Sequence, residues 1–293
     1  MEIIEWIGMI VVIYFGYLLV MECKLIVSGI SNVQQIYGKG CWALVTGGTD
    51  GIGKGFCQEF AKQGVNVCIV ARNRQKAENL IKELKQINDK PQYKFVIADF
   101  QNCLKENFFQ NIYSEIKDLD IGLLINNVGV LTVGEFHKTI DIDQQNQIII
   151  NCIPVVFMTK YLLPMMKKRQ RSGVINLSSL TGRFAYPYYQ VYSATKAFND
   201  YFTRSLQIEV ENVDFLSFRP GFVQTAMVKN QTDLLTVSTQ QCVKAALLQL
   251  GNKDATAGHV KHQIQTFLLS LAEGKFMDTI SPIFVKYLYK QKH

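Results

Sequence analysis

The sequence predicts one α/β domain built on a parallel β-sheet, with an apolar helix in front of it. Short runs rich in Val, Ile, Leu and Phe recur along the chain, and amphipathic stretches such as Arg74–Ile87 and Leu104–Leu119 separate them. Continuously apolar strands that alternate with helices are typical of a parallel sheet with both faces covered. Right-handed connections then make the sheet doubly wound and Rossmann-like. The expected strands are Trp42–Thr46, Val65–Ala71, Tyr93–Ala98, Gly122–Ile125, Gly173–Leu177 and Asp214–Phe218.

The composition supports a large core and excludes several classes of protein. Of the 293 residues, 48% are hydrophobic and 19% are charged, which is the balance of a folded domain. The net charge of +7 forms no basic stripe interleaved with aromatic residues, so we expect no nucleic-acid partner. The seven cysteines are odd in number and form no Cys-x-x-Cys pair, which indicates reduced core residues. The four histidines form no pair with cysteine or carboxylate at ligand spacing, so we expect no metal site.

The N-terminal helix is predicted by a stretch without charges. Residues Trp6–Met21 carry no charged side chain, and Ile3 and Ile4 extend the apolar run. Crossing a bilayer takes roughly 17 to 25 residues, which this run provides. A cleaved signal peptide usually begins with basic residues, whereas Glu2 and Glu5 stand here. A wholly buried helix would need a partner on every side, so we expect a membrane anchor.

The charges after the anchor predict its orientation and the organisation of the chain. Lys24 and Lys39 follow the apolar run, and the positive-inside rule therefore places the rest of the chain in the cytosol. We expect residues 1–22 to form the anchor, 23–40 a juxtamembrane connection, 41–257 the α/β domain and 258–293 a C-terminal extension.

Two weaker features leave alternatives open. The extension contains apolar clusters at Phe267–Leu269 and Ile283–Val285, which are too short to span a bilayer. They could form helices at a membrane surface, pack on the sheet or contact a second copy of the chain in a homodimer. The basic run Lys167–Arg171 could attract the phosphate of an acyl-CoA, but a solvated helix end is the favoured interpretation.

A glycine-rich turn directly after the first expected strand predicts a dinucleotide site. The segment Thr46–Gly53 reads Thr-Gly-Gly-Thr-Asp-Gly-Ile-Gly and lies between a strand and an amphipathic helix. Gly47 permits the tight turn, and Gly51 lets a pyrophosphate approach backbone N–H groups. Gly53 allows the helix to pack closely on the strand. An ordinary glycine turn would not need this context.

The end of the second expected strand predicts which dinucleotide binds. Enzymes specific for NAD usually place an acidic residue about 20 residues past the glycines, where it holds the ribose 2′-hydroxyl. That place holds Ala71 followed by Arg72. Because a guanidinium can form two hydrogen bonds with a 2′-phosphate, the sequence favours NADPH. The alternative is a solvated arginine at a strand end.

A tyrosine and a lysine four residues apart predict the catalytic centre. Tyr192 and Lys196 open a helix after the fifth expected strand, and Ser179 stands at the end of that strand. A second pair with the same spacing, Tyr113 and Lys117, has no such serine and precedes the fourth strand. Active sites of parallel sheets lie at the carboxyl ends of their strands, which separates the true pair from the chance one.

The spacing suits proton transfer to a carbonyl oxygen. Residues four apart share a helix face, so Lys196 can bring its ammonium near the Tyr192 hydroxyl. Lowering a tyrosine pKa from about 10 to about 7 takes roughly 4 kcal/mol, which a lysine ammonium and an oxidised nicotinamide could supply together. Tyr192 would then be the general acid, Ser179 would stabilise negative charge on the substrate oxygen, and the cofactor would supply the hydride.

Together these motifs resemble the short-chain dehydrogenase/reductase family over roughly Gly40–Ala257. The resemblance implies a Rossmann-like fold, a nicotinamide cofactor and carbonyl reduction or alcohol oxidation. The matching segments are Thr46–Gly53, Asp99, Asn126–Gly129, Asn151, Ser179, Tyr192 with Lys196, and Pro220–Thr225.

The resemblance also implies roles for residues that spacing alone does not assign. Asp99 would contact the adenine, while Asn126 and Gly129 would hold the sheet and the wall of the cofactor site. Asn151 would complete a proton relay through water to Lys196. Val223 and Thr225 would bind the nicotinamide carboxamide. The full set expected to bind the cofactor is Gly47, Thr49, Asp50, Gly51, Ile52, Gly53, Arg72, Asp99, Asn126, Gly129, Tyr192, Lys196, Pro220, Gly221, Val223 and Thr225.

Within the family the chain looks like one branch. The anchor, the exact glycine segment Gly47–Lys54 and the motifs at Asn126–Gly129 and Tyr192–Lys196 resemble very-long-chain 3-oxoacyl-CoA reductases and the 17-beta-hydroxysteroid dehydrogenases of types 12 and 3. Members are endoplasmic reticulum membrane proteins. The resemblance implies NADPH-dependent reduction of a lipophilic ketone: a long-chain 3-oxoacyl-CoA first, or a 17-ketosteroid as the alternative. A non-catalytic NADP-binding scaffold is less favoured, because all four catalytic residues are present.

Overall fold

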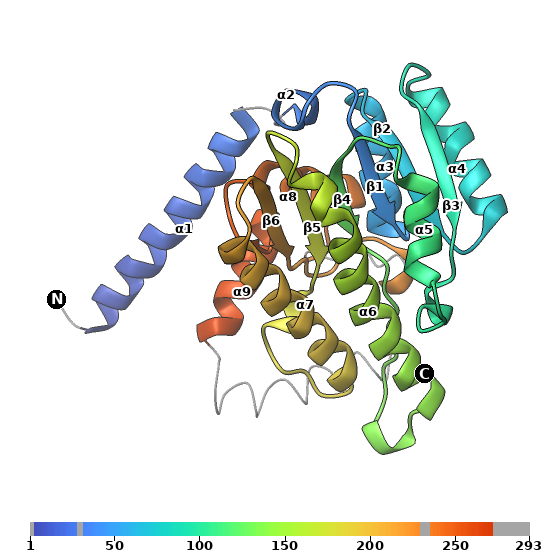
Figure 1. Ribbon diagram of the computed structural model, residues 1–293. Coiled ribbons are helices and arrows are strands. Elements are labelled where there is room, and N and C mark those ends of the chain that lie inside the picture. The colour runs from blue at the N-terminus through green and yellow to red at the C-terminus, as the bar shows by residue number, and fades with distance from the viewer. Residues whose placement is uncertain (1–2, 28–31, 229–234, 272–293) are drawn as a thin grey trace.

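The protein is organised around a seven-stranded parallel sheet in the order β3-β2-β1-β4-β5-β6-β7 (Figure 1). The computed structural model describes residues 3–27, 32–228 and 235–271. The predicted Rossmann-like fold is confirmed, and the six expected strands are present with bounds shifted by at most one residue. The strands are β1 (Trp42–Thr46), β2 (Asn66–Ala71), β3 (Tyr93–Ile97), β4 (Ile121–Asn126), β5 (Ser172–Leu177), β6 (Val213–Phe218) and β7 (Ala255–Thr256).

The strand order reverses at β1, and this reversal creates the site. Strand β1 pairs with β2 on one side, where Val45 faces Ile69, and with β4 on the other, where Val45 faces Ile125. The chain winds outward from β1 to β3 and then crosses to the opposite side of β1 to form β4. The segments that leave the carboxyl ends of β1 and β4 therefore diverge, which opens the crevice in which doubly wound sheets bind ligands.

Helices cover both faces of the sheet, and each face has its own apolar cluster. The helices are α1 (Ile3–Val27), α2 (Val33–Tyr37), α3 (Gly51–Lys62), α4 (Arg74–Ile87), α5 (Phe108–Ile116), α6 (Asp141–Met166), α7 (Gln190–Glu209), α8 (Thr239–Gln249) and α9 (Val260–Leu271). Helices α3, α4 and α8 pack on one face, where Val45 points. Helices α5, α6 and α7 pack on the other, where Leu44 points. Alternate side chains of β1 thus enter different clusters, as expected for a strand buried on both sides.

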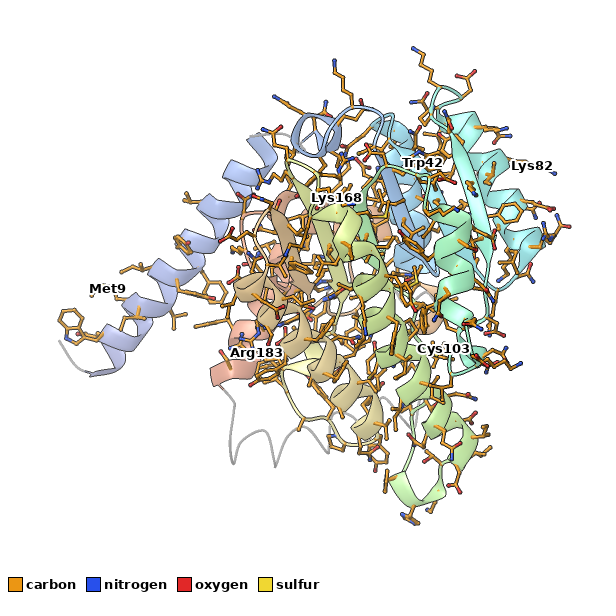
Figure 2. The ribbon with its side chains drawn as sticks, in the orientation of Figure 1. Met9, Trp42, Lys82, Cys103, Lys168 and Arg183 are labelled. Atoms are coloured by element: carbon orange, nitrogen blue, oxygen red, sulfur yellow. The ribbon has the colours of Figure 1, made fainter. Side chains whose placement is uncertain are left out.

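Helix α1 extends away from the domain and exposes apolar side chains. Figure 2 shows Met9 on the outer part of this helix, and Ile10 and Ile13 are 62% and 64% exposed. It packs against α9, where the rings of Tyr14 and Phe267 stack with centroids 4.2 Å apart. The described residues include one helix that is long and apolar enough to cross a membrane, but it is α6, which packs on the sheet. The membrane anchor therefore stays a prediction.

The segment expected to be a juxtamembrane connection contains a docked helix. Tyr37 of α2 is buried, and its hydroxyl donates to the Asp214 carboxylate at 2.9 Å. Arg169 donates to the Tyr37 carbonyl and pairs with Asp120. These contacts lie at the amino ends of the strands, so α2 fastens the chain between α1 and β1 to the edge opposite the crevice.

The ion pairs of two arginines show where the basic run Lys167–Arg171 lies in the fold. Arg169 and Arg171 form ion pairs with Asp120 and Asp214 at the amino ends of β4 and β6. Lys168 precedes β5, whereas Arg183 follows its carboxyl end, and Figure 2 shows the two toward opposite ends of the domain. The favoured interpretation as a helix end is consistent with this position, which is remote from the crevice.

Candidate active site

The glycine turn after β1 brings three backbone segments close together. Gly47 and Gly51 have φ angles of +65° and +52°, a region that side chains disfavour. A Cβ at Gly47 would lie 3.1 Å from the Cα of Val128, and one at Gly53 would lie 2.5 Å from the Gly47 carbonyl oxygen. Asp50 caps helix α3, since its carboxylate accepts from the Gly51 N–H at 2.7 Å. The predicted reasons for glycine at positions 47 and 53, a tight turn and close packing, are thus met by the geometry.

A pocket of about 320 Å³ opens at the crevice between the ends of β1, β2 and β4. Both Arg72, which is exposed, and Thr225 line this pocket. The amino terminus of α3 borders the pocket, and the partial positive charge of a helix amino terminus favours an anion there. The predicted cofactor residues that line it are Gly47, Thr49, Asp50, Gly51, Ile52, Arg72, Asp99, Gly129 and Thr225.

The predicted catalytic side chains meet at the carboxyl end of β5. Ser179 follows this strand and caps the short helix η3 (Leu180–Gly182). Tyr192 lies in the first turn of α7, and its hydroxyl forms a hydrogen bond with the Ser179 side chain. The Lys196 ammonium lies 5.6 Å from the centre of the Tyr192 ring and donates to the Leu177 carbonyl at 2.8 Å. One strand end and one helix face therefore position all three groups.

Burial governs the electrostatics of these groups. Desolvation raises the pKa of Tyr192 to about 12, although the hydrogen bond from Ser179 opposes the shift. Desolvation also lowers the pKa of Lys196 to about 8. The protein alone therefore moves the tyrosine pKa away from 7, so a tyrosine that ionises near neutrality would need the further positive charge of an oxidised nicotinamide.

The chain matches a family model described as short chain dehydrogenase over residues 41–235. The chain belongs to the short-chain dehydrogenase family. It is 34% identical over 233 residues to 17-beta-hydroxysteroid dehydrogenase type 3 of Danio rerio, covering 77% of this chain and 75% of that protein. It is 31% identical over 285 residues to very-long-chain 3-oxoacyl-CoA reductase-B of Danio rerio, covering 93% and 90%. The solved short-chain dehydrogenase from Sphingobium yanoikuyae in complex with NADPH has a TM-score of 0.68 at 20% identity, covering 82% of this chain and 96% of that one.

Membership of the short-chain dehydrogenase family makes the chain an oxidoreductase that acts on CH–OH or C=O groups. The second Tyr-x-x-x-Lys sequence, which contains Tyr113, lies elsewhere in the fold. Tyr113 lies on α5, where its ring packs 6.0 Å from that of Tyr161 on α6. The second Tyr-x-x-x-Lys sequence is therefore a packing feature, as the sequence predicts.

The fourth family residue, Asn151, lies on α6 and is buried. Its amide oxygen accepts from the Val130 N–H at 2.8 Å, and its amide nitrogen donates to the Thr195 hydroxyl at 3.0 Å. A Cβ added to Gly129 would lie 3.2 Å from the Asn151 amide oxygen and 3.4 Å from the Lys196 nitrogen. Asn151 thus lies beside the lysine, while its amide holds the segment that follows β4.

Several predicted cofactor residues lie outside the pocket lining. Asn126 is buried in the sheet, where its amide donates to Thr159 and Asn176 at 3.1 and 2.8 Å. Gly221 packs under α9, since a Cβ there would lie 2.8 Å from the His262 ring. The residues of the predicted set that do not line this pocket are Gly53, Asn126, Tyr192, Lys196, Pro220, Gly221 and Val223.

One polar residue of the pocket lining was not assigned a role from the sequence. Asn127 lines the pocket, and its amide donates to the carbonyls of Thr46 and Gly47 at 3.0 and 3.1 Å. These bonds fix the glycine turn to the end of β4. The signal was present in the family motif at Asn126–Gly129, but the motif does not state which of its two asparagines faces the turn.

Proposed function

We propose that the protein reduces a lipophilic ketone to a secondary alcohol with NADPH, and that a long-chain 3-oxoacyl-CoA is its substrate. The observation that carries this proposal is the convergence of Ser179, Tyr192 and Lys196 at the end of β5, beside a pocket that reaches Arg72. These residues provide a proton donor, a hydrogen-bond donor and a cation at the places that carbonyl reduction requires.

The residues of the pocket suit a phosphorylated dinucleotide. The amino terminus of α3 and the absence of a side chain at Gly51 leave room and N–H donors for a pyrophosphate. Arg72 would pair with a 2′-phosphate, and the Asp99 carboxylate would accept from the adenosine half. Thr225 and Gly129 would border the nicotinamide. When bound, NADPH supplies the hydride.

The catalytic residues would each act on the substrate oxygen or its proton. The Ser179 hydroxyl donates to the carbonyl oxygen and stabilises the charge that develops there. Tyr192, protonated at neutral pH because burial raises its pKa, delivers the proton to that oxygen. The Lys196 ammonium stabilises the phenolate that remains, and Asn151 holds the neighbouring segment in place.

The choice of substrate rests on two further features. Helix α1 exposes an apolar surface, which suits an enzyme of lipid substrates held at the endoplasmic reticulum membrane with its domain in the cytosol. One relative is named a 3-oxoacyl-CoA reductase and another a 17-beta-hydroxysteroid dehydrogenase, so a 17-ketosteroid is the second candidate.

Assays of the purified full-length chain with NADPH test the proposal. We expect turnover of a long-chain 3-oxoacyl-CoA and a loss of at least about 100-fold in kcat in the Tyr192→Phe variant, because general acid catalysis contributes about 10² to 10⁴. Tyr113→Phe is the matched control, with the same change in the chance motif, and should keep wild-type activity. Activity on a 17-ketosteroid alone would replace the acyl-CoA assignment, and full activity of Tyr192→Phe would refute the mechanism.

A further inference from the structure

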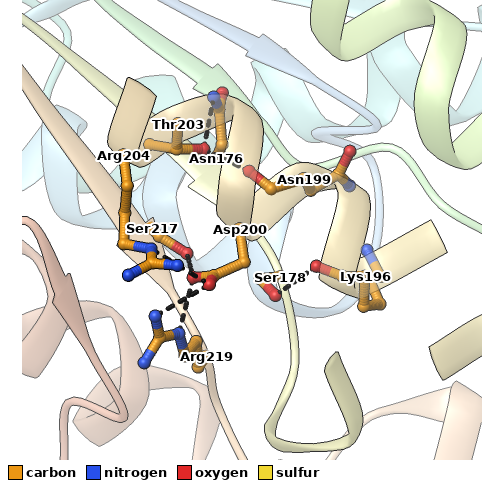
Figure 3. A network of polar contacts seen from close by, with 9 residues as sticks. All are labelled: Asn176, Ser178, Lys196, Asn199, Asp200, Thr203, Arg204, Ser217 and Arg219. Atoms are coloured by element: carbon orange, nitrogen blue, oxygen red, sulfur yellow. Dashed lines mark hydrogen bonds and ion pairs between the residues drawn. The ribbon is translucent and has the colours of Figure 1, made fainter. Parts of the chain in front are cut away.

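A buried acidic residue joins the catalytic helix to the neighbouring strand. Asp200 lies one helical turn after Lys196 on α7 and is 6% exposed. Its carboxylate accepts from the Ser217 hydroxyl at 2.5 Å and from Nε and Nη2 of Arg219 at 2.6 and 2.8 Å. Figure 3 shows these contacts converging on Asp200 from the end of β6. The carboxylate thus connects α7 and β6 through two side chains.

The geometry of the pair makes it a stiff connection. The planar guanidinium of Arg219 forms two hydrogen bonds with the Asp200 carboxylate. These bonds fix both the distance and the relative orientation of the two groups. The side chains of Asp200 and Arg219 are 8% and 15% exposed, so solvent screens their attraction weakly. Arg204 adds a second, outer cation 3.3 Å from the same carboxylate. Removal of the Asp200 carboxylate would leave the Arg219 charge without this partner.

On the α7 side, the pair is close to the catalytic groups. The Ser178 hydroxyl donates to the Lys196 carbonyl at 2.7 Å, which holds the helix to the end of β5. A Cβ at Gly182 would lie 2.7 Å from the Lys196 carbonyl carbon. Helix α7 and the segment carrying Ser179 therefore touch backbone to backbone, and a shift of α7 would move Tyr192 relative to Ser179.

On the β6 side, the pair adjoins the segment that leads to the pocket. The Arg219 N–H donates to the Thr256 carbonyl at 2.8 Å, and the Leu180 N–H donates to the Pro220 carbonyl at 3.1 Å. The chain then continues to Thr225, which lines the pocket. Arg219 therefore directly follows β6 and precedes the segment that would border the nicotinamide.

We propose that Asp200 and Arg219 are positioning residues for the reaction: they fix the distance and angle between the Tyr192 face of α7 and the segment Pro220–Thr225. This inference rests on the proposed reductase function. Neither residue touches the substrate. They affect the rate because the reaction is sensitive to misplacement of the reacting groups, and a shift of 1 Å can lower the rate about 100-fold.

The test compares Asp200→Asn with a matched control on the same strand. Asp214→Asn removes the carboxylate of another Asp–Arg pair, with Arg171, at the amino end of β6, away from the site. For each variant we would measure thermal stability, the NADPH dissociation constant by fluorescence titration, and kcat per NADPH-binding site. The substrate is whichever ketone the wild type turns over, assayed well below the melting temperature. The kinetic isotope effect on kcat with NADPH deuterated at the transferred position completes the set.

We expect Asp200→Asn to lower kcat at least about ten-fold and to raise the isotope effect, because displaced reacting groups slow the hydride step. The NADPH dissociation constant should change by less than about three-fold. The residues expected to bind the cofactor, Arg72, Asp99 and the glycine turn, follow other strands and do not contact the Asp–Arg pair. Asp214→Asn should lose stability but keep its kcat. Arg219→Lys, which keeps the charge and loses the two-pronged contact, should also lower kcat; it replaces Asp200→Asn if that variant does not fold.

Two results would overturn the inference. One is a wild-type kcat and isotope effect in Asp200→Asn, or in Arg219→Lys where that variant is used instead. The other is an equal loss of kcat in Asp214→Asn, which would make the effect one of general packing. A wild type that reduces no ketone would refute the proposed function itself. If Tyr192→Phe reduces the ketone as fast as the wild type, the proposed catalytic role of Tyr192 fails, and if it does not, only the positioning role is at stake.

Discussion

Lys196 is buried, and this predicts how the reaction depends on pH. Its pKa is lowered to about 8, whereas Tyr192, at about 12, stays protonated across the usual range. Raising the pH through 8 therefore removes the proton of the lysine, and with it the charge that would stabilise the tyrosine phenolate. We expect the kcat/KM for NADPH in ketone reduction to be constant below about pH 7 and to fall above about pH 8.

The Lys196→Arg variant is the control for this assignment. A guanidinium stays charged over the whole range, so the variant should be slower but should lose the decline above pH 8. Rates measured between about pH 6 and pH 10 report the pKa values of the free enzyme. If the decline persists near pH 8 in Lys196→Arg, another group controls it.

Arg72 is expected to determine the preference for NADPH over NADH. In Arg72→Asp the cation that would pair with the 2′-phosphate becomes an anion, which should repel it. We expect the preference for NADPH over NADH, measured as the ratio of kcat/KM values, to fall by about 10- to 100-fold, because hydrogen bonds to charged groups contribute about 1.5 to 3 kcal/mol. Arg74→Ala is the control, since Arg74 lies over the Phe95 ring at 5.3 Å. An unchanged ratio in Arg72→Asp would contradict the assignment to NADPH.

At the scale of elements, the strands could be predicted where their signal is local. The bounds of strand β1 were predicted correctly, because its continuous run of apolar residues is typical of a strand that is buried on both faces. Strand β7 was missed because two residues, Ala255 and Thr256, carry no periodic pattern. The helix expected over Leu104–Leu119 is shorter, Phe108–Ile116, because Asn107 adopts a left-handed φ of +58°. That conformation, which asparagine tolerates better than most residues, prevents the helix from starting earlier.

The residues of the site could likewise be predicted where their signal is local in the sequence. The glycine turn, Arg72, and the pair of Tyr192 and Lys196 are contiguous motifs, so their geometry could be expected from spacing. The connection between Asp200 and Arg219 joins residues 19 positions apart, one on a helix and one directly after a strand, and no local sequence pattern predicts it. Contacts of this kind depend on how elements pack, which a single sequence does not specify.

Helix α1 is expected to hold the chain in a membrane. We expect the full-length chain to stay in the membrane pellet after carbonate extraction. The double variant Ile10→Lys and Ile13→Lys should move to the soluble fraction, because each lysine near the centre of a membrane helix costs about 2.5 to 3.5 kcal/mol. Both side chains are exposed in the protein, so the change should not disturb the fold. Ile208→Lys, at an 88% exposed position on α7, should stay in the pellet.

Extraction of the unaltered chain by carbonate would contradict the anchor prediction. Release of Ile208→Lys along with the double variant would assign membrane binding to a wider apolar surface. The stacking of Tyr14 on Phe267 connects α1 to α9. The second apolar cluster of the extension, Ile283–Val285, lies outside the described residues.

At the scale of the whole molecule, the two apolar clusters share one sheet. Strands β1, β2, β4, β5 and β6 send alternate residues into each cluster, so neither face can lose its packing without exposing the strands that support the other. We infer that the α/β domain unfolds as one cooperative unit. The cysteines report on this, because they lie on both faces. The six whose side chains are described are free and buried, as predicted: Cys41, Cys57, Cys68, Cys103, Cys152 and Cys242.

Thiol labelling therefore tests the cooperativity. Burial raises the pKa of Cys68 to about 12 and also raises that of Cys57, so both thiols stay protonated and unreactive at pH 8 while they are buried. With a Cys23→Ser variant and an aromatic disulfide reagent, we expect almost no labelling in buffer and complete labelling in urea. Cys57, in the cluster of α3 and α8, and Cys68, in the opposite cluster, should become reactive at the same urea concentration when mapped by mass spectrometry. Earlier labelling of one of them would mean that one face of the sheet opens alone, and the single-unit description would then be wrong.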